Sequence, residues 1–384
     1  MRRRSESCTR SSIPPAGECS VVVLSVIVSP HAAASVLPVV TAQHIIGGMS
    51  YTTPTQIRLD HYPTGIPGDD AWTVTHEPAP ELTDGQVEVD VQLISIDPGM
   101  RGWITPMRSY MPPIEPGDVM RSFSIGPVTR SASDRIQVGD VVTGFLGVQT
   151  TAVVDARAVR PCDVSVAPVE LHLGVLGMTG FTGYFGMLDI GRPDSSHTVV
   201  VSAASGAVGS VAAQVAKRSG ARVVGIAGGP HKCAYLVNEL GLDAAVDYKS
   251  TERSIADQLA TASPSGIDVY FDNVGGEVLE EVLQRINDHA RIVLCGGISG
   301  YGDMANAAGP AGYMKLVTTG SSMQGFTMKD YFHRIPEAFA DLSDWVAEGS
   351  LQHREHIVDG IERFPEAFRM LFAGQNHGKL LLRP

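Results

Sequence analysis

Thr198-Val-Val-Val-Ser-Ala-Ala-Ser-Gly-Ala-Val-Gly-Ser210 combines three local features in a short space. The β-branched run 199–201 predicts a buried strand, and Gly206 and Gly209 predict a tight turn. Apolar residues at helical spacing over 208–216 then predict a helix. A strand, a glycine turn and a helix in this order direct free backbone N–H groups towards a phosphate, because the turn lacks side chains that would block the approach.

The spacing alone is a weak signal, since Ala203 stands where the G-x-G-x-x-G pattern has its first glycine. An ordinary turn between a strand and a helix is the alternative. A second strand-like run, 221–227, follows at the expected distance and favours a dinucleotide site. The residues predicted to bind the coenzyme pyrophosphate are Ser205, Gly206, Ala207, Val208 and Gly209.

Strand-like and helix-like segments alternate from 198 to about 300, which predicts a parallel, doubly wound sheet with its ligand at the carboxyl ends of the strands. We expect strands near 198–204, 221–227, 244–248, 267–272 and 290–295, and helices near 207–219, 231–241, 253–262 and 276–287. Helices near 330–348 and 365–373 and a strand at 379–382 complete the expected elements.

The region from Met49 to His172 differs, with short alternating segments separated by glycine and proline. This pattern predicts a β-barrel-like domain. The apolar, glycine-rich segment 173–188 predicts closely packed helices between the two parts. A chain of 384 residues is also longer than one ordinary core needs, which agrees with two domains.

Composition limits the possible partners and compartment. A formal net charge of −12 argues against nucleic acid or an anionic membrane as the main partner. The five cysteines form no Cys-x-x-Cys pair, which is typical of free thiols in a reducing compartment, and we expect a cytoplasmic protein.

The first 48 residues have a different composition. Arg2, Arg3 and Arg4 precede an apolar run at 21–28 and small residues at 32–35, the order found in a secretory signal. The apolar run lies far from the arginines, however, and is too short to span a bilayer. We therefore favour a disordered extension or a start codon set too early, with the folded chain opening at Met49.

The coenzyme preference is predicted from the end of the second strand. An NAD site usually has a carboxylate there for the ribose hydroxyls, but residues 223–233 contain no Asp or Glu. Lys232 instead falls in the first turn of the next helix, where a cation opposes the helix dipole unless an anion lies beside it. Lys232 is therefore predicted to bind the 2′-phosphate of NADP(H), with a solvated surface lysine as the alternative.

Metal ligands are not predicted. Zinc sites need clustered Cys and His ligands, whereas His76 lacks a partnering cysteine and His353 with His356 lacks a third ligand.

Without a metal, Tyr301 is the candidate electrophile, because it follows the fifth strand at the coenzyme edge and a protonated phenol can donate to a developing oxyanion. Packing against the coenzyme ribose is the alternative for Tyr301. Trp103 and Tyr110, on the long loop 98–116, are candidates for lining a substrate cleft.

Together, the motifs at 203–209, 227–232, 271–276, 323–326 and 374–379 resemble zinc-independent medium-chain dehydrogenase/reductases, in the branch of prostaglandin reductase and alkenal double-bond reductase. The resemblance implies a GroES-like catalytic domain (49–172 and 349–384) beside a Rossmann NADP-binding domain (173–348), and a homodimer. It also implies coenzyme contacts from Lys232, Tyr248, Asn273, Gly296, Phe326 and Asn376, with Tyr301 stabilising the enolate.

Two positions depart from the family pattern. Gly229 replaces a serine, which could loosen the discrimination between NADPH and NADH. Gly99 replaces the tyrosine of the Asp-Pro-Tyr-Met-Arg-Gly motif, which suggests a wider substrate pocket.

The expected activity is that of an NADPH-dependent ene reductase, with hydride added at the β-carbon of an α,β-unsaturated aldehyde or ketone. Tyr301 and a ribose hydroxyl would hold the enolate oxygen, and the α-carbon would take its proton from solvent or from that relay. The alternatives are an NADPH quinone reductase of the same fold, acting on a small quinone, and a non-catalytic NADPH-binding sensor.

Overall fold

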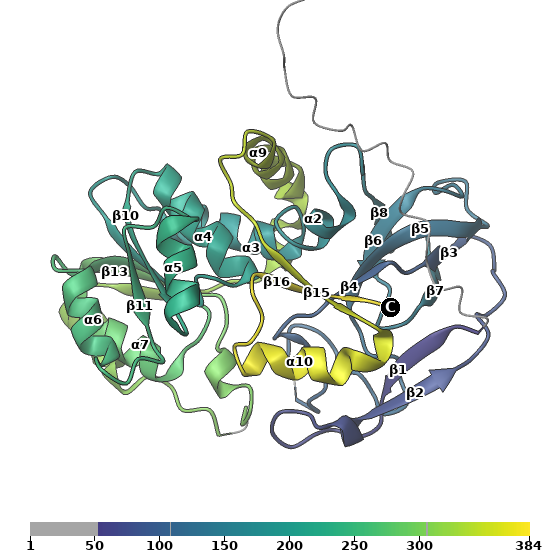
Figure 1. Ribbon diagram of the computed structural model, residues 1–384, viewed down its shortest axis with the longest axis horizontal. Helices are drawn as coiled ribbons and strands as arrows, with labels where there is room; N and C mark the ends of the chain where they lie inside the picture. The colour runs from purple at the N-terminus through teal and green to yellow at the C-terminus, as the bar shows by residue number, and fades with distance from the viewer. Residues whose placement is uncertain (1–52, 108, 305) are drawn as a thin grey trace, which may run out of the picture. The chain divides into compact units, whose positions relative to one another are not determined.

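The computed structural model describes residues 53–384 except 108 and 305. The expectations for the first 48 residues lie outside this part of the chain. The expected α/β fold is confirmed by a six-stranded sheet in the order β11-β10-β9-β12-β13-β14, in which every neighbouring pair is parallel (Figure 1). Its strands are β9 (Thr198–Ser202), β10 (Arg222–Ala227), β11 (Ala244–Asp247), β12 (Ile267–Asp272), β13 (Ile286–Leu294) and β14 (Ser322–Gly325). This order is that of a doubly wound dinucleotide-binding sheet, with its switch point between β9 and β12.

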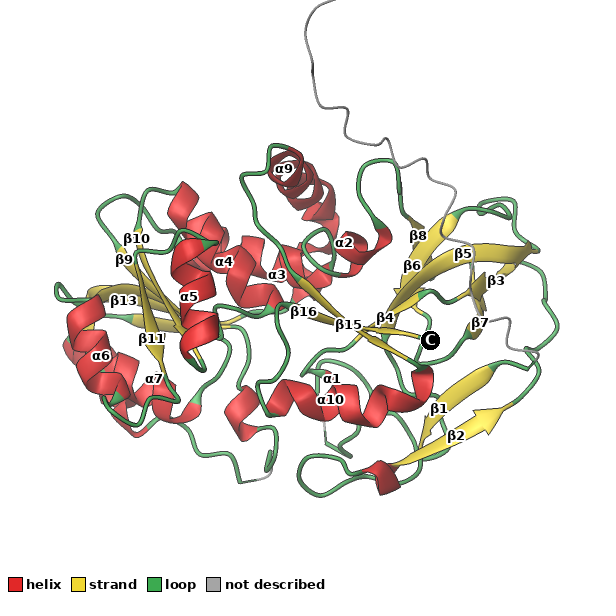
Figure 2. Ribbon diagram, viewed as in Figure 1, coloured by secondary structure: helices red, strands yellow, loops and turns green. Residues whose placement is uncertain are grey.

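Helices cover both faces of this sheet, as Figure 2 shows. Val199 and Val201 of β9 point to one face and Val200 to the other, so the strand is buried on both sides. The first face packs against α3 (Met178–Phe185), α4 (Ala207–Arg218), α5 (Pro230–Asn238) and α9 (Ile335–Ala347). The second face packs against α6 (Ile255–Ala262) and α7 (Gly276–Leu283).

A second sheet of eight strands is built from both ends of the described chain. Its early strands are β3 (Gln86–Asp90), β4 (Leu93–Ser95), β5 (Phe123–Ser131), β6 (Val141–Phe145), β7 (Thr151–Asp155) and β8 (Val159–Pro161). Two late strands, β15 (Glu355–Asp359) and β16 (Lys379–Arg383), join the same sheet, with β16 between β15 and β4. A core of buried apolar residues joins this sheet to a hairpin of β1 (Thr55–Leu59) and β2 (Trp72–His76) and to α10 (Phe364–Phe372).

Short helices occupy the connections. They are α1 (Met100–Trp103), α2 (Val169–Leu173), a π-helical turn (Gly186–Gly191) after α3, and α8 (Lys315–Thr318) before β14. The packed helices expected over 173–188 are present as the end of α2 and as α3. Within residues 53–107, 109–304 and 306–384, no helix is long and apolar enough to cross a membrane.

The structure differs from the sequence expectation at the start of one helical segment. The helix expected at 330–348 begins as a 3₁₀ helix (Met328–Arg334) and becomes α-helical only at Ile335, which precedes Pro336. A proline is well placed in the first turn of an α-helix, because it has no N–H to donate there.

The turn between β9 and α4 depends on how closely the helix approaches the strand. Ala203 takes a left-handed backbone conformation with φ of +47°, a region that favours glycine. A Cβ atom on Gly209 would overlap the carbonyl oxygen of Ala203 and would stand 2.9 Å from its carbonyl carbon. Gly209 is therefore required by the approach of α4, whereas Ala203 occupies a glycine-type conformation at some cost.

We expect Gly209→Ala to lower the free energy of unfolding by about 2–3 kcal/mol, because α4 must move away from β9. Ala203→Gly should raise it by about 0.5–1 kcal/mol, since relief of the left-handed strain exceeds the added entropy of the unfolded chain. Urea unfolding followed by circular dichroism measures both changes. A destabilising Ala203→Gly would contradict this account of the turn.

Candidate functional site

The phosphate turn lies where β9 ends and α4 begins. The predicted coenzyme residues Ser205, Gly206, Ala207, Val208 and Gly209 occupy it, and Ser205 is buried. The first N–H groups of a helix have no partners within the helix, and those of α4 begin at this turn. A bridge between Gly206 and Gly378 also pairs the turn with the segment that leads into β16, so a late part of the chain borders the phosphate turn.

Lys232 and Tyr248 meet the same late segment. The Lys232 Nζ atom donates to the carbonyl oxygen of Gly374 over 2.9 Å. A Cβ atom on Gly374, whose φ is +62°, would stand 3.2 Å from the Tyr248 hydroxyl. Burial, followed by the charge of Lys249, lowers the pKa of Lys232. Lys232, Tyr248 and Lys249 therefore gather cationic and hydroxyl groups around the loop at 373–376.

Asp247 is a carboxylate in this region that sequence reasoning missed. Its Oδ1 atom accepts hydrogen bonds from the backbone N–H groups of Gly229 (2.7 Å) and Lys249 (2.9 Å). It thereby holds the two loops that carry the cations. Gly229 has φ of +90°, a conformation in which the serine of the family pattern would be strained.

Asn273 and Gly296 lie at the carboxyl ends of β12 and β13. The Asn273 side-chain amide donates to the Ser202 carbonyl oxygen over 2.7 Å, and the Gly296 N–H donates to the Asp272 carbonyl oxygen over 3.1 Å. Tyr301 follows on the loop after β13, and its hydroxyl lies 3.5 Å from the point where a Cβ atom on Gly296 would stand. Burial raises the pKa of Tyr301, with smaller contributions from Tyr110 and Cys295, so the phenol stays protonated at neutral pH.

Phe326 and Asn376 take different places. Phe326 follows β14 and packs against Gly186, where a Cβ atom would stand 2.6 Å from the phenyl ring. The Asn376 amide donates to the Gly378 carbonyl oxygen over 2.9 Å, which places Asn376 beside the phosphate turn. The coenzyme contacts implied for both residues stay predictions.

Tyr110 occupies the space beside Gly99. Its hydroxyl lies 3.1 Å from the point where a Cβ atom on Gly99 would stand, and it accepts a hydrogen bond from Trp103 Nε1 over 3.1 Å. The Trp103 ring contacts Phe145 edge-on at 5.9 Å, and Phe145 contacts Phe123 at 3.9 Å between ring centroids. The absence of a side chain at 99 is thus partly compensated by Tyr110, within a wall of aromatic rings.

A buried ion pair ties the loop that carries Gly99 to β16. The Lys379 Nζ atom lies 2.6 Å from Asp97 Oδ1 and donates to the Ile96 carbonyl oxygen over 3.3 Å. Lys379 is only 3% exposed, so its charge depends on these partners. The second Asp97 oxygen accepts the hydroxyl of Ser95.

Cys295 borders the same edge of the sheet. Burial, followed by the charge of Asp272, raises the pKa of its thiol to about 12. At this pKa the side chain is a neutral thiol and a poor nucleophile at neutral pH.

The histidines weighed as metal ligands make other contacts. His76 shares a hydrogen bond with Thr55, and His353 pairs with Glu355 at 3.0 Å. Over the part of the chain that the structure describes, no group of three or more His, Cys, Asp or Glu side chains is placed to hold a metal ion.

Two family models match the chain. The N-terminal domain of oxidoreductase matches residues 55–162, and a domain described as zinc-binding dehydrogenase matches residues 207–348. The NADPH-dependent curcumin reductase of Escherichia coli (strain K12) is 38% identical over 84% of this chain and 94% of its own length. The chain belongs to the medium-chain dehydrogenase/reductase family.

Further members of the family support the zinc-independent branch. Prostaglandin reductase 1 of Rattus norvegicus is 36% identical over 83% of this chain and 95% of its own length. Among solved structures, CurA from Vibrio vulnificus in complex with NADPH has a TM-score of 0.81 and 38% identity, and covers 86% of this chain and 98% of its own. These findings confirm the expected family, its fold and its class of enzyme, the oxidoreductases.

We expect Asp97→Asn to lower the free energy of unfolding by about 3–5 kcal/mol, because it leaves the buried Lys379 ammonium without its anionic partner. Lys379→Met should cost less, because the Asp97 side chain is 26% exposed and keeps the Ser95 hydroxyl as a partner. The double variant should lose less than the sum of the two single losses, since it removes both partners together. Thermal or urea unfolding of all four proteins measures the coupling. Additive losses would show that the pair contributes nothing beyond its separate contacts.

Proposed function

We propose that this protein is an NADPH-dependent ene reductase that acts on α,β-unsaturated aldehydes or ketones. The observation that carries the proposal is the position of Lys232, which lies in the first turn of α5 and reaches the loop at 373–376. The relatives from Escherichia coli and Rattus norvegicus, named as reductases of curcumin and prostaglandin, support the substrate class.

The residues present fit a phosphorylated dinucleotide. The turn at 205–209 offers backbone N–H groups with no side chain at Gly206 or Gly209 to block a pyrophosphate. Lys232 and Tyr248 offer a cation and a hydroxyl for the 2′-phosphate, and the second strand, β10, contains no carboxylate. Asn273, Gly296, Phe326 and Asn376 are proposed to border the rest of the coenzyme.

NADPH, when bound, supplies the hydride that is added to the β-carbon of the substrate. Tyr301 is proposed to donate a hydrogen bond to the substrate carbonyl oxygen, where negative charge develops as the β-carbon is reduced. Its raised pKa keeps the proton on the phenol in this role. The aromatic wall of Trp103, Phe145 and Tyr110 is proposed to bind the flat, apolar body of a conjugated substrate and to exclude water from it.

The two sheets support the domain boundaries expected from the sequence. We propose that residues 49–172 and 349–384 form the catalytic domain, because β15 and β16 lie in the same sheet as β3 to β8. Residues 173–348 are proposed to form the coenzyme-binding domain around the six-stranded sheet.

The proposed function predicts different effects from two substitutions. Tyr301→Phe should lower kcat for an enone by about a hundredfold, because one oxyanion donor is lost. Lys232→Ala should raise KM for NADPH far more than KM for NADH and should leave kcat at saturating NADPH nearly unchanged. Absorbance of the reduced coenzyme, followed with a panel of enals, enones and quinones, measures these constants.

The same assay separates the alternatives. Turnover of quinones but not of enones would indicate a quinone reductase, and coenzyme binding without any turnover would indicate a sensor. Because the Tyr301 pKa is raised, the wild-type kcat should show no loss from ionisation of this phenol up to about pH 9. An unchanged kcat in Tyr301→Phe would show that Tyr301 contributes by packing and not by donating a hydrogen bond.

We also propose a homodimer that forms at β14. Within the described chain β14 pairs only with β13, so its other edge is available for pairing. Beside it, Tyr313, Met314 and Val317 expose apolar side chains, with Val317 70% exposed. A second copy would cover both the edge and these side chains.

Light scattering should give twice the chain mass for the wild-type protein and a smaller mass for Val317→Glu. A wild-type monomer at every concentration would contradict the proposal.

A further inference from the structure

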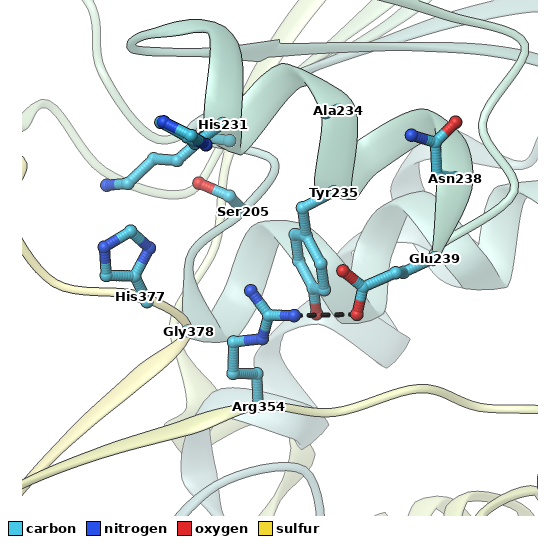
Figure 3. A pocket seen from close by; sticks show the side chains of 10 residues that line it. Ser205, His231, Ala234, Tyr235, Asn238, Glu239, Arg354, His377 and Gly378 are labelled. Carbon is cyan, nitrogen blue, oxygen red and sulfur yellow. Dashed lines mark hydrogen bonds and ion pairs between the residues drawn. The ribbon is translucent and has the colours of Figure 1, made fainter.

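A cavity of about 500 Å³ lies between α5 and the segment that enters β16, and basic side chains dominate its lining. Figure 3 shows His231 at the start of α5 and His377 and Arg354 opposite it, around a space that Ser205 also borders. Of the described residues that line the cavity, only Glu239 is acidic, and it is paired with Arg354 at 2.7 Å. The Arg354 guanidinium also lies over the Tyr235 ring at 4.1 Å.

Backbone constraints place His377 at this cavity. Gly378 takes φ of +73°, and a Cβ atom there would overlap the carbonyl oxygen of Arg354, so the chain passes Arg354 without space for a side chain. The Lys379 N–H donates to the same oxygen over 2.8 Å. Because Gly378 also forms the bridge to Gly206, His377 is fixed next to the phosphate turn.

The charges that face His377 disfavour its protonated form. Burial lowers the pKa of His377, and Lys232, His356, Arg354 and His231 lower it further. His356 is the nearest of the histidines, since its Nδ1 accepts the His377 backbone N–H over 3.4 Å. A phosphate placed among these groups would reverse the effect, because an opposite charge nearby favours the protonated imidazole.

We propose that His231 and His377 complete, with Lys232, the recognition site for the 2′-phosphate of the coenzyme, and that His377 takes up a proton when NADP(H) binds. The proposal rests on the proposed function and adds two recognition residues and a pH dependence to it. We interpret the cavity and the predicted coenzyme contacts as one phosphate site and not two, because Ser205 and Lys232 belong to both.

The direction of the pH effect follows because proton uptake is coupled to coenzyme binding. If binding raises the pKa of His377, the affinity for NADP⁺ increases as the pH falls through the interval between its free and bound pKa values. NAD⁺ lacks the phosphate, so its affinity should not follow the same curve. The phosphate itself loses charge below a pKa of about 6, which limits the gain at lower pH.

Isothermal titration calorimetry of the full chain with NADP⁺ and with NAD⁺, between about pH 6 and 8, tests the proposal. Two buffers of different ionisation enthalpy at each pH give the number of protons taken up. The ratio of Kd for NAD⁺ to Kd for NADP⁺ should fall by about tenfold from the lower to the higher pH in the wild-type protein. Proton uptake should accompany NADP⁺ and not NAD⁺.

Three variants separate charge from structure. The double variant His231→Gln with His377→Gln should abolish the proton uptake that the protein contributes. The ratio of Kd for NAD⁺ to Kd for NADP⁺ should then vary with pH only through ionisation of the phosphate. His231→Lys with His377→Lys should keep a high ratio that no longer falls with pH, because the positive charge is fixed. His61→Gln, which removes an exposed imidazole paired with Asp60 outside the cavity, should behave like the wild-type protein.

The outcomes distinguish this proposal from the proposed function. If the wild-type protein and the double glutamine variant take up equal numbers of protons and show equal ratios, while Lys232→Ala still lowers NADP⁺ affinity, the histidine site is wrong and the NADPH site stands. If NADP⁺ does not bind to the wild-type protein, both proposals are wrong.

Discussion

The buried carboxylate of Asp272 holds together the edge of the sheet at which the candidate site lies. Its Oδ1 atom accepts hydrogen bonds from the Ser202 hydroxyl (3.1 Å), the Tyr270 hydroxyl (2.8 Å) and two backbone N–H groups that follow it. Its main-chain oxygen accepts the N–H groups of Cys295 and Gly296. A carboxylate that is 1% exposed needs such partners, and those of Oδ1 and of the main-chain oxygen connect the ends of β9, β12 and β13, whereas Oδ2 has no partner among the described residues.

Two kinds of surface meet around this fixed edge. On one side, Lys232 and Lys249 gather positive charge near the phosphate turn, beside His231 and His377. On the other side, Trp103, Phe145 and Tyr110 present aromatic rings and hydroxyl groups. The proposed reaction needs both, since one binds the charged coenzyme and the other binds an apolar substrate beside Tyr301. The contacts of Gly378 with Gly206 and of Lys379 with Asp97 hold the two surfaces in place.

The elements that could be predicted from the sequence are those with buried residues and the most regular apolar pattern. Strands β9, β10 and β12 were expected because their apolar, β-branched residues fill both faces of a parallel sheet. Strands β14 and β15 were not, because their residues are mostly exposed or half-buried and show no apolar run. Tyr301 was found from topology, since the edge of the sheet follows from the strand order. The contacts of Asp272, and the placement of residues 231 and 377 around one cavity, join distant segments and cannot be predicted from a local sequence pattern.

The position of β16 has a consequence for folding. Its five residues lie between β15 and β4, in the interior of the eight-stranded sheet, and its buried first residue, Lys379, pairs with the half-buried Asp97. A chain in which residues 379–383 are not yet paired therefore has an open slot in that sheet, with the edges of β4 and β15 exposed. The sheet is complete only when β16 pairs on both sides, and until then the two exposed edges are places where another strand can pair.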